Sequence, residues 1–514
     1  MLKRIKKAYP CIFCAMLTGM GTGGVIYLFQ GLVHLALFLS GKAFDAARGN
    51  PVLIPAIVLG AALLGLFSSI IIKAEPDAAG GGIPSSVAAI RGIISLRWLR
   101  NLLATVSASV LTYVAGVPLG TEGPCVQLGT AVGRGTANLS EKFEGALDRY
   151  AMTSGACAGF AAVTGAPLSG ILFALEEAHK KITPTLLVMS AVSVFTGVCT
   201  LDVLNLLTGG TKPLFQIPSL DTLRFTSLWL PFVIGIVCGL AAAGFTKLHK
   251  FFGGFWREKL SKFPKHFSFP IIFALCAAVG CFVDGAIGSG HSVIDELILG
   301  SIAVKLLVLV LVLRSIFFII ANNAGVTGGT FLPSLTLGAG LGMLCTVIGQ
   351  NLGIVDRGLT VFGITVGMAA FIGAVNKTPL MSIAFGIEAL GGGANVPSFV
   401  LATIAAYLVM EIMGGKEFAE IAIEAKEKKS PRSTHSTEAK EYVCTVNVEK
   451  DSFADGRNPD DLLLPYGCRI TSKNAALHGG DKVVVCCVTG DAEYVKRKLG
   501  DVFGATVQLS PLEE

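Results

Sequence analysis

Charged residues are scarce in this chain. Only 15% of its 514 residues are Asp, Glu, Lys or Arg, whereas 52% are hydrophobic. This composition excludes an ordinary soluble protein and is typical of a protein that crosses a membrane several times. The net charge is a modest +6, and no basic stripe is interleaved with aromatic residues. We therefore expect no nucleic-acid partner.

The residue groups that indicate a metalloprotein or an enzyme are also missing. No Cys/His cluster has zinc-ligand spacing and no Ser/His/Asp constellation is present, so we expect no metal, no cofactor and no enzymatic activity. The 13 cysteines form no evident disulfide framework. Cys11 and Cys14 have the spacing of a redox motif, but they lie in an apolar run, which favours a packing role.

Apolar runs, by contrast, are long and numerous. The first, from Cys11 to Leu39, follows a short basic segment that contains Lys3, Arg4, Lys6 and Lys7. It is too long for a signal-peptide core and predicts a retained membrane helix with a cytosolic N-terminus. We expect a multi-pass protein of the cell inner (plasma) membrane, in contact with lipid, with both termini in the cytosol. Ile83–Ile90 and Pro167–Leu175 are shorter segments bounded by Gly or Pro, which is typical of broken helices around a transport site.

An internal repeat runs through the apolar part. The stretches that begin at Gly120 and Gly329 share the pattern Gly-Thr-x-x-Pro-x-x-x-Leu-Gly, 209 residues apart. A second pair, Ala166–Glu176 and Thr378–Glu388, shares Pro, Leu, Phe and Glu at an offset of 212. Gly80–Gly82 also corresponds weakly to Gly288–Gly290. Matches in one order and at nearly one spacing predict two homologous halves, at about 10–210 and 225–415.

The chain is predicted to have two domains. Residues 1–423 form the transmembrane transport domain, and the charged interval 424–441 is predicted to be a solvated linker. Beyond it, Tyr442–Val448 and Lys482–Val488 have the pattern of strands, and Ala492–Leu499 that of a helix. We therefore expect 442–514 to be a small cytosolic α+β domain with a regulatory or assembly role.

Three segments place flexible glycines and a proline at the start of an apolar helix. They are Gly80–Pro84, Gly120–Pro124 and Gly329–Pro333. Proline suits a first helical turn, glycine leaves the backbone accessible, and the unpaired amides of a helix start attract anions. A single motif of this kind predicts only a tight turn between packed helices. Three motifs together with the repeat favour an anion site that needs no full positive charge.

Glu122 is the most informative single residue, because a carboxylate in a membrane segment is costly and is usually functional. It can occupy an anion position when charged and leave when protonated, and its alternative role is purely structural. Glu176 and Glu177 end an apolar helix before His179. One of them is a candidate proton relay and the other a polar helix end. The repetition of Glu176 as Glu388 favours a partly architectural role for Glu176, but the pattern does not choose between them.

These motifs resemble those of the CLC family of chloride channels and chloride/proton antiporters, over roughly residues 10–423. The family signatures G-S-G-I-P, G-[RK]-E-G-P and G-x-F-x-P correspond, in order, to the three segments beginning at Gly80, Gly120 and Gly329. The resemblance implies an all-α polytopic membrane fold with two inverted-topology repeats of tilted and broken helices, and a homodimer whose subunits each contain a pathway. It also implies that chloride or a related anion, and protons, are the transported species.

The resemblance assigns roles to individual residues. Glu122 corresponds to the external gating glutamate, and Glu177 to the internal proton glutamate of antiporters. The anion-binding positions that it implies are Gly81, Gly82, Ile83, Gly123, Thr330, Phe331 and Phe418. Among these, Thr330 and Phe331 match positions whose backbone amides hold the central anion.

Three departures bear on selectivity and coupling. Gly81 replaces the serine of the first motif, which removes a hydroxyl ligand, and Thr121 replaces a basic residue beside the gate. The family's central tyrosine is absent from the region of Gly414–Phe418, where Phe418 is the nearest candidate and cannot donate a hydrogen bond. Chloride/proton antiport is the predicted function. A passive chloride channel, or a transporter that prefers fluoride or nitrate, remains the alternative.

The tail resembles, more weakly, the C-terminal ligand-binding domain of potassium-uptake regulators, through Gly456-Arg457 and the run Gly479–Val485. A small ligand on this domain is therefore expected. The tail also suggests an alternative function of a different class, that of a potassium-transporter subunit. The chain lacks a T-V-G-Y-G-like filter, however, and this function does not explain Glu122.

Overall fold

The computed structural model describes residues 2–139, 144–181, 183–209, 222–256, 265–428, 439–471 and 476–511, with isolated residues between them. The helices of the first half are α1 Leu2–Gly49, α2 Ile54–Ala74, α3 Ile83–Arg91, α4 Trp98–Val114, α5 Glu122–Ala137, α6 Glu144–Thr164, α7 Pro167–Phe173 and α8 Pro184–Thr208. Those of the second half are α9 Trp229–Phe255, α10 Lys265–Phe282, α11 His291–Leu299, α12 Val304–Ala324, α13 Phe331–Asn351, α14 Thr360–Val375, α15 Pro379–Glu388, α16 Val396–Ile412 and α17 Phe418–Glu427. The C-terminal elements are β1 Lys440–Asn447, β2 Cys468–Ile470, β3 Lys482–Thr489, α18 Ala492–Phe503 and β4 Ser510–Pro511.

Short helical turns join several of these elements. A π-helical turn follows α7 at Ala174–Ala178. Turns of 3-10 helix lie at Pro51–Leu53, Pro76–Ala78, Phe225–Ser227, Arg357–Leu359, Gly392–Asn395 and Pro459–Asp461.

The helical, polytopic architecture predicted from the composition is confirmed. Within the described residues, eight helices are long and apolar enough to cross a membrane. The predicted first span, 11–39, lies inside α1, which continues to Gly49. Large apolar side chains such as Leu28, Phe195 and Leu206 are 67 to 83% exposed, as expected for a surface that faces lipid rather than water. The side chains of the basic N-terminal segment lie outside the described residues.

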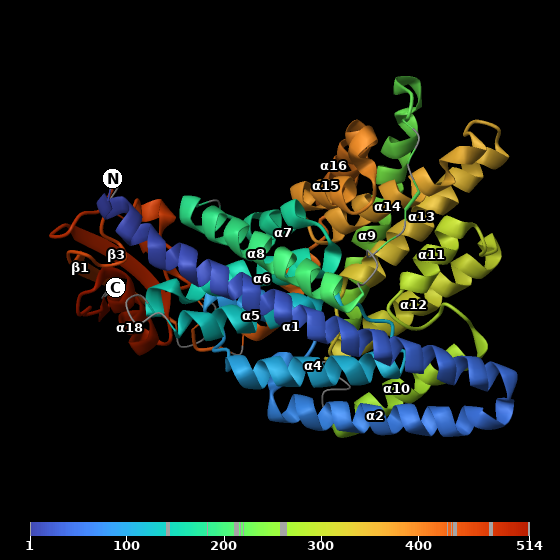
Figure 1. Cartoon of the computed structure of the whole chain (residues 1–514), viewed down its shortest axis with the longest axis horizontal. Helices are drawn as coiled ribbons and strands as arrows, with labels where there is room; N and C mark the ends of the chain where they lie inside the picture. The colour runs from blue at the N-terminus through green and yellow to red at the C-terminus, as the bar shows by residue number, and fades with distance from the viewer. Residues whose placement is uncertain are drawn as a thin grey trace.

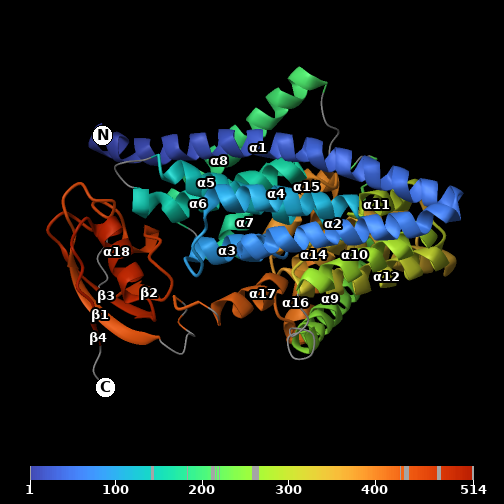
Figure 2. The ribbon, with the colours of Figure 1, turned by 90° about the horizontal axis from the view of Figure 1, so that it is seen from below.

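The broken helices predicted from Gly and Pro are also present. Helix α3 has nine residues and α7 has seven, too few to span a bilayer. Each has proline in its first turn, where the missing N–H removes a donor that would be unpaired there. Their counterparts by sequence offset, α11 and α15, have nine and ten residues. Short helices therefore lie among the longer ones in both halves, with α7, α11 and α15 labelled in Figure 1 and α3 in Figure 2.

Glycines permit the closest helix contacts. On α5 and α6, a methyl group added at Gly129 would strike the carbonyl of Gly155, and one added at Gly155 would strike the carbonyl of Gly129. Gly338 of α13 and Gly367 of α14 have the same reciprocal relationship. Small residues thus bring these helix backbones together, which is the usual way helices associate in a bilayer, where lipid removes the hydrophobic driving force.

A small α+β domain lies at one end of the molecule, beside the N-terminal end of α1 (Figures 1 and 2). Its antiparallel sheet has the strand order β2-β3-β1-β4, and β1 pairs with β3 from Lys440 to Asn447. Strands expected at 442–448 and 482–488 and the helix expected at 492–499 therefore form, with bounds that differ by a few residues.

The interval 424–441, predicted to be a solvated linker, differs from that expectation. Helix α17 continues to Glu427, and β1 begins at Lys440. Between them, Ser430 donates to the carbonyl of Ile93, and Arg432 to the hydroxyl of Ser95. Lys429, Ser433 and residues 435–438 lie outside the described residues. The described part of this interval is held against both domains, because Arg432 also pairs with Asp491 of the C-terminal domain at 3.0 Å.

Candidate ion-transport site

The three glycine- and proline-containing segments meet in the interior. Gly120 and Gly329 form an isolated antiparallel bridge, in which each N–H donates to the other's carbonyl at 2.7 and 2.5 Å. The first segment joins through Gly80, whose N–H donates to Gly325 and whose carbonyl accepts from Gly328, both at 3.2 Å. The starts of α3, α5 and α13 are therefore held at one place, although they lie far apart in the sequence.

Backbone approach at this junction leaves no room for side chains. Gly82 has φ +78°, and a Cβ there would strike the carbonyl of Gly123. A Cβ at Gly123 would in turn strike the carbonyl of Gly81. The methyl of Thr330 lies 3.1 Å from the position of a Cβ at Gly81. Gly81, Gly82, Gly123 and Thr330 are thus brought together, and Gly82 and Gly123 are sterically required.

Glu122 is the first residue of α5 and is completely buried. Its Oε2 lies 2.7 Å from where a Cβ of Gly120 would be. The backbone N–H groups of Glu122 itself, Leu332 and Thr121 lie near the carboxylate, but neither oxygen completes a hydrogen bond within the described residues. The buried hydroxyl of Tyr113 donates to the Gly120 carbonyl at 2.7 Å and so braces the backbone beside it. A buried, unpaired carboxylate is costly when charged, which suits a group that moves or changes protonation.

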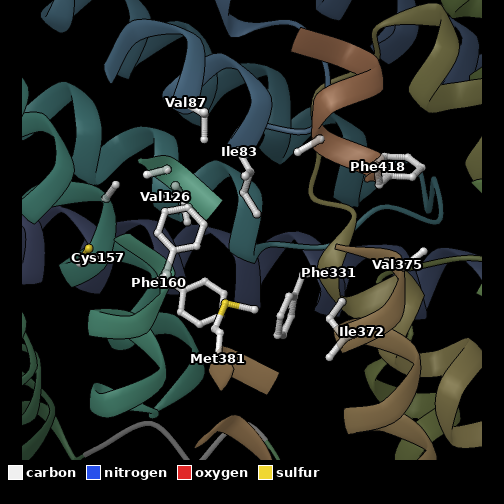
Figure 3. Close-up of a cluster of buried hydrophobic side chains, with 14 of the residues drawn as sticks. Ile83, Val87, Val126, Cys157, Phe160, Phe331, Ile372, Val375, Met381 and Phe418 are labelled. Atoms are coloured by element: carbon white, nitrogen blue, oxygen red, sulfur yellow. The ribbon is translucent and has the colours of Figure 1, made fainter. Parts of the chain in front are cut away.

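Ile83 and Phe331 contribute apolar side chains to the wall of this region. The Phe331 ring meets Phe160 and Phe385 edge-on, at centroid distances of 5.1 and 5.2 Å. In Figure 3, Phe331 lies between Met381 and Ile372, within the same buried cluster as Ile83. The Ile83 amide donates to the Gly81 carbonyl at 2.9 Å, so this N–H already has a partner.

Phe418, the candidate for the missing tyrosine, begins α17 and is 3% exposed. Its ring packs on His249 at 4.3 Å, and on Phe318 and Phe245 at 5.7 and 6.2 Å. It belongs to an aromatic cluster with α9 and α12, and Figure 3 shows it apart from Phe331.

Two polar residues beside the first motif were missed by sequence reasoning. His249 of α9, which is buried, shares a 3.1 Å hydrogen bond with the Asn322 amide oxygen. The amide nitrogen of Asn322 lies 3.7 Å from the position of a Cβ at Gly81. Phe418 is thus linked to the first motif through His249 and Asn322. Polar residues inside apolar helices were the available signal, since such residues in membrane spans are usually functional.

The two adjacent glutamates after α7 have different environments. The Glu176 carboxylate accepts from the backbone N–H groups of Leu380 and Met381, at 3.0 and 2.7 Å. Glu177 is 2% exposed, and its Oε2 has no hydrogen bond within the described residues. No hydrogen bond joins Glu177 to Glu122 in the part of the chain that the structure describes.

Several charged side chains lie close enough to Glu177 to act on its carboxylate. They include Glu417, Lys180 and Arg91. Lys180 pairs with Glu417 at 2.7 Å, and Arg91 pairs with Glu420 of α17 at 3.3 Å. Burial raises the pKa of the Glu417 carboxyl, and the ion pair with Lys180 opposes that shift. These pairs leave Glu177 as the buried acid of the group that lacks an ion pair among the described residues.

The described residues also contain no grouping suited to a metal. Among them, no group of three or more His, Cys, Asp or Glu side chains could hold a metal ion.

Comparison with known proteins agrees with this architecture. The profile of the family described as "Voltage gated chloride channel" matches residues 64–411. The chain is 28% identical over 428 residues to the H(+)/Cl(-) exchange transporter ClcA of Salmonella typhi, covering 81% of this chain and 88% of that protein. The same values hold for ClcA of Salmonella typhimurium.

Solved structures show the same fold. A slow cyanobacterial Cl-/H+ antiporter superposes with a TM-score of 0.73 at 20% identity, covering 81% of this chain and 97% of that one. A CLC-type fluoride/proton antiporter superposes with a TM-score of 0.64 at 22% identity, covering 80% and 97%. The family profile spans well over half of the chain, and the motifs of the three helix starts lie within it, so this protein belongs to the voltage-gated chloride channel (CLC) family.

Proposed function

We propose that this protein exchanges chloride for protons across a membrane, with Glu122 as the gate. The observation that carries the proposal is the buried Glu122 carboxylate, which lacks a hydrogen bond within the described residues and stands where three helix starts meet. The Salmonella relatives are named H(+)/Cl(-) exchange transporters, which supports the same function.

Backbone amides would hold the anion. The first-turn N–H groups of a helix have no partner within the helix, and its dipole is positive at that end. Helices α3, α5 and α13 present such ends near Gly82, Gly123, Thr330 and Phe331. An anion held by these partial charges can still be released, which transport requires.

Glu122 would couple the anion to the proton. In its charged form the carboxylate competes with the anion for the amides at these helix starts. In its protonated form it is neutral, and the anion takes that place. Each cycle of the side chain then moves protons one way and anions the other.

Glu177 is our candidate for the proton relay to the cytosol. It is buried without an ion pair among the described residues and lies close to the charged pairs formed by Lys180 and Arg91. Both carboxylate oxygens of Glu176, by contrast, accept hydrogen bonds from backbone amides, which supports an architectural role.

Asn322 would replace the hydroxyl that Gly81 lacks. Its amide nitrogen is a hydrogen-bond donor close to the first motif, and His249 holds the amide oxygen. Amide and serine donors differ in reach and geometry, so the liposome assay below compares chloride with nitrate and fluoride.

We further infer the arrangement around this site. Residues 1–423 carry transport, as two inverted halves joined by reciprocal contacts such as the Gly120–Gly329 bridge. The tail, 442–514, regulates transport from the cytosol, which also holds the N-terminus. The family resemblance supports a homodimer in the inner membrane.

Purified protein in liposomes tests the function. With an inward chloride gradient and no proton gradient, we expect protons to be driven out against their electrochemical potential. The measurement is external pH together with chloride flux, with protein-free liposomes as the control. Chloride flux that never drives protons would overturn the exchange proposal.

That last result would favour a passive chloride channel. The observation on its side is that neither Gly81 nor Phe418 carries a hydroxyl that could donate a hydrogen bond to the anion. The same liposomes, loaded with chloride, nitrate or fluoride in turn, measure the anion preference under either outcome.

A further inference from the structure

A cavity of about 640 Å³ lies between the membrane domain and the C-terminal domain. Its walls come from the end of α3, the turn before α4, the last turn of α5, the start of α6, and α18. Figure 1 shows α18 next to this end of α5 and α6. The volume lies within the range of about 300–1,000 Å³ that is usual for small-molecule sites.

The described lining is strongly basic. Its cationic side chains are Arg134, Arg149, Arg432, Arg497 and Lys498. Only two carboxylates, Asp148 and Asp501, face them. A third carboxylate, Asp491, pairs with Arg432 from outside the lining, at 3.0 Å. Five cations therefore meet three acids, which leaves an excess of positive charge in a partly enclosed space.

The ion pairs do not neutralise all of this positive charge. Asp148 is shared by Arg134 and Lys498, the latter at 2.5 Å, and Lys498 also lies 3.6 Å from Asp501. Arg149 donates to the carbonyls of Ile90 and Leu464, which are neutral acceptors. The exposed Arg497 lies 6.0 Å from the ring centroid of Tyr494 and has no ion pair with a carboxylate among the described residues. Two guanidinium groups thus have no carboxylate partner, and that of Arg497, which is exposed, is available to a negatively charged ligand.

We propose that this cavity binds a small phosphate-bearing anion of about nucleotide size. Guanidinium groups bind phosphate oxygens in pairs of parallel hydrogen bonds, which makes arginine suited to this ligand class. The half-buried ring of Tyr494, stacked 3.8 Å from the guanidinium of Arg432, adds an apolar surface to the same wall. The phosphate belongs either to a soluble nucleotide or to a lipid headgroup, since helix α4, which exposes the apolar side chains of Leu99 and Leu103, begins two residues after Leu96 of the lining.

The position of the cavity connects a bound ligand to the transport site through two helices. Helix α3 begins at Ile83 in the first motif and reaches the lining at Ala89. Helix α5 begins at Glu122 and reaches it at Arg134. A bound ligand therefore contacts the far ends of two helices whose first turns form the candidate ion site.

The test compares two charge reversals on α18 in the full-length protein. Arg497→Glu changes the lining, whereas Lys496→Glu makes the same change in net charge one residue away, outside the lining. We expect ATP and inorganic pyrophosphate to bind the wild type in calorimetry. Arg497→Glu should weaken binding about tenfold or more, because one charge-assisted hydrogen bond contributes roughly 1.5–3 kcal/mol, and Lys496→Glu should leave it unchanged.

Two further measurements separate the sources, and the first of them needs no variant. Adenosine, which lacks phosphate, should not bind the wild type. If the ligand is a lipid, dioleoylphosphatidylglycerol should raise the melting temperature of the wild type but not that of Arg497→Glu. Dioleoylphosphatidylcholine and ATP should then leave the melting temperature of the wild type unchanged. The proposal is overturned if ATP, pyrophosphate and phosphatidylglycerol all fail to bind. It is also overturned if adenosine binds as tightly as ATP, or if both reversals weaken binding equally.

Discussion

Glu176 and Glu388, 212 residues apart, cap each other's helices. The Glu176 carboxylate accepts from the first-turn amides of α15, at Leu380 and Met381, and the Glu388 carboxylate accepts from those of α7, at Leu168 and Ser169. All four distances lie between 2.7 and 3.0 Å. A carboxylate at a helix start satisfies free N–H groups and complements the dipole. This reciprocal capping fixes the two halves against each other and gives Glu176 a role that Glu177 does not share.

Replacing Glu122 with Gln should abolish proton movement and leave anion flux. Glutamine keeps the shape of the protonated side chain but cannot titrate. The measurement is paired proton and chloride flux in liposomes, with wild-type protein alongside. Uphill proton movement by the mutant would rule out Glu122 as the proton-carrying group.

Glu177→Gln should uncouple transport, whereas Glu176→Gln should weaken the fold. The first change removes the buried acid without a hydrogen-bonded partner at Oε2, so anion flux should persist without proton coupling. The second removes the charge from two hydrogen bonds, and should lower the free energy of unfolding by roughly 1–3 kcal/mol. Glu388→Gln is the matched control, because it removes the reciprocal cap and should resemble Glu176→Gln.

Paired flux and thermal melting distinguish these roles. Coupling kept in Glu177→Gln but lost in a stable Glu176→Gln would reverse the assignment. Coupling kept in both variants would show that protons reach Glu122 without either side chain.

Gly81→Ser should raise chloride selectivity over nitrate. A serine there adds a hydroxyl donor to a site otherwise made of backbone amides and Asn322. Its Cβ would lie 3.1 Å from the Thr330 methyl, a tight contact that a small shift relieves. Gly81→Ala makes the same contact without the hydroxyl and is the control. Equal chloride/nitrate flux ratios for the serine and alanine variants would count against a ligand role for this position.

Asn322→Leu should weaken chloride binding about two- to tenfold, the usual effect of losing one neutral hydrogen bond. The control is Asn323→Leu, because Asn323 donates to the carbonyls of Ile319 and His249 instead of approaching Gly81. Chloride affinity measured by calorimetry on the purified proteins checks this. The same affinity in both variants as in the wild type would show that Asn322 is not an anion ligand.

Gly123→Ala should destabilise the protein by several kcal/mol or prevent its assembly. The added methyl would strike the Gly81 carbonyl, and backbone cannot move away as a flexible side chain can. Gly24→Ala in α1 is the matched control, because nothing lies within 4 Å of its added Cβ, and it should stabilise the helix by up to about 1 kcal/mol. Thermal melting in detergent measures both, and equal melting temperatures would contradict the close approach at Gly123.

The sequence alone determined the membrane class, the short proline-led helices and the small α+β tail. Each follows from a local pattern: a long apolar run, a Gly-Pro start, or an alternation of β-branched residues. It also picked out Glu122, because a carboxylate in an apolar helix stands out wherever that helix packs. The sequence also showed the order of the three motifs, because each motif is a local Gly and Pro pattern.

Tertiary structure decided what depends on residues far apart in the chain. Glu176 and Glu177 are neighbours in sequence, and only the start of α15 shows which one is held by backbone amides. Asn322 reaches the first motif, and Arg432 reaches Ser95, through contacts that no local pattern contains. The basic cavity likewise combines side chains from both domains. Hydrogen bonding and packing across hundreds of residues set these relationships, because local sequence fixes a helix or a turn but not the neighbour against which it lies.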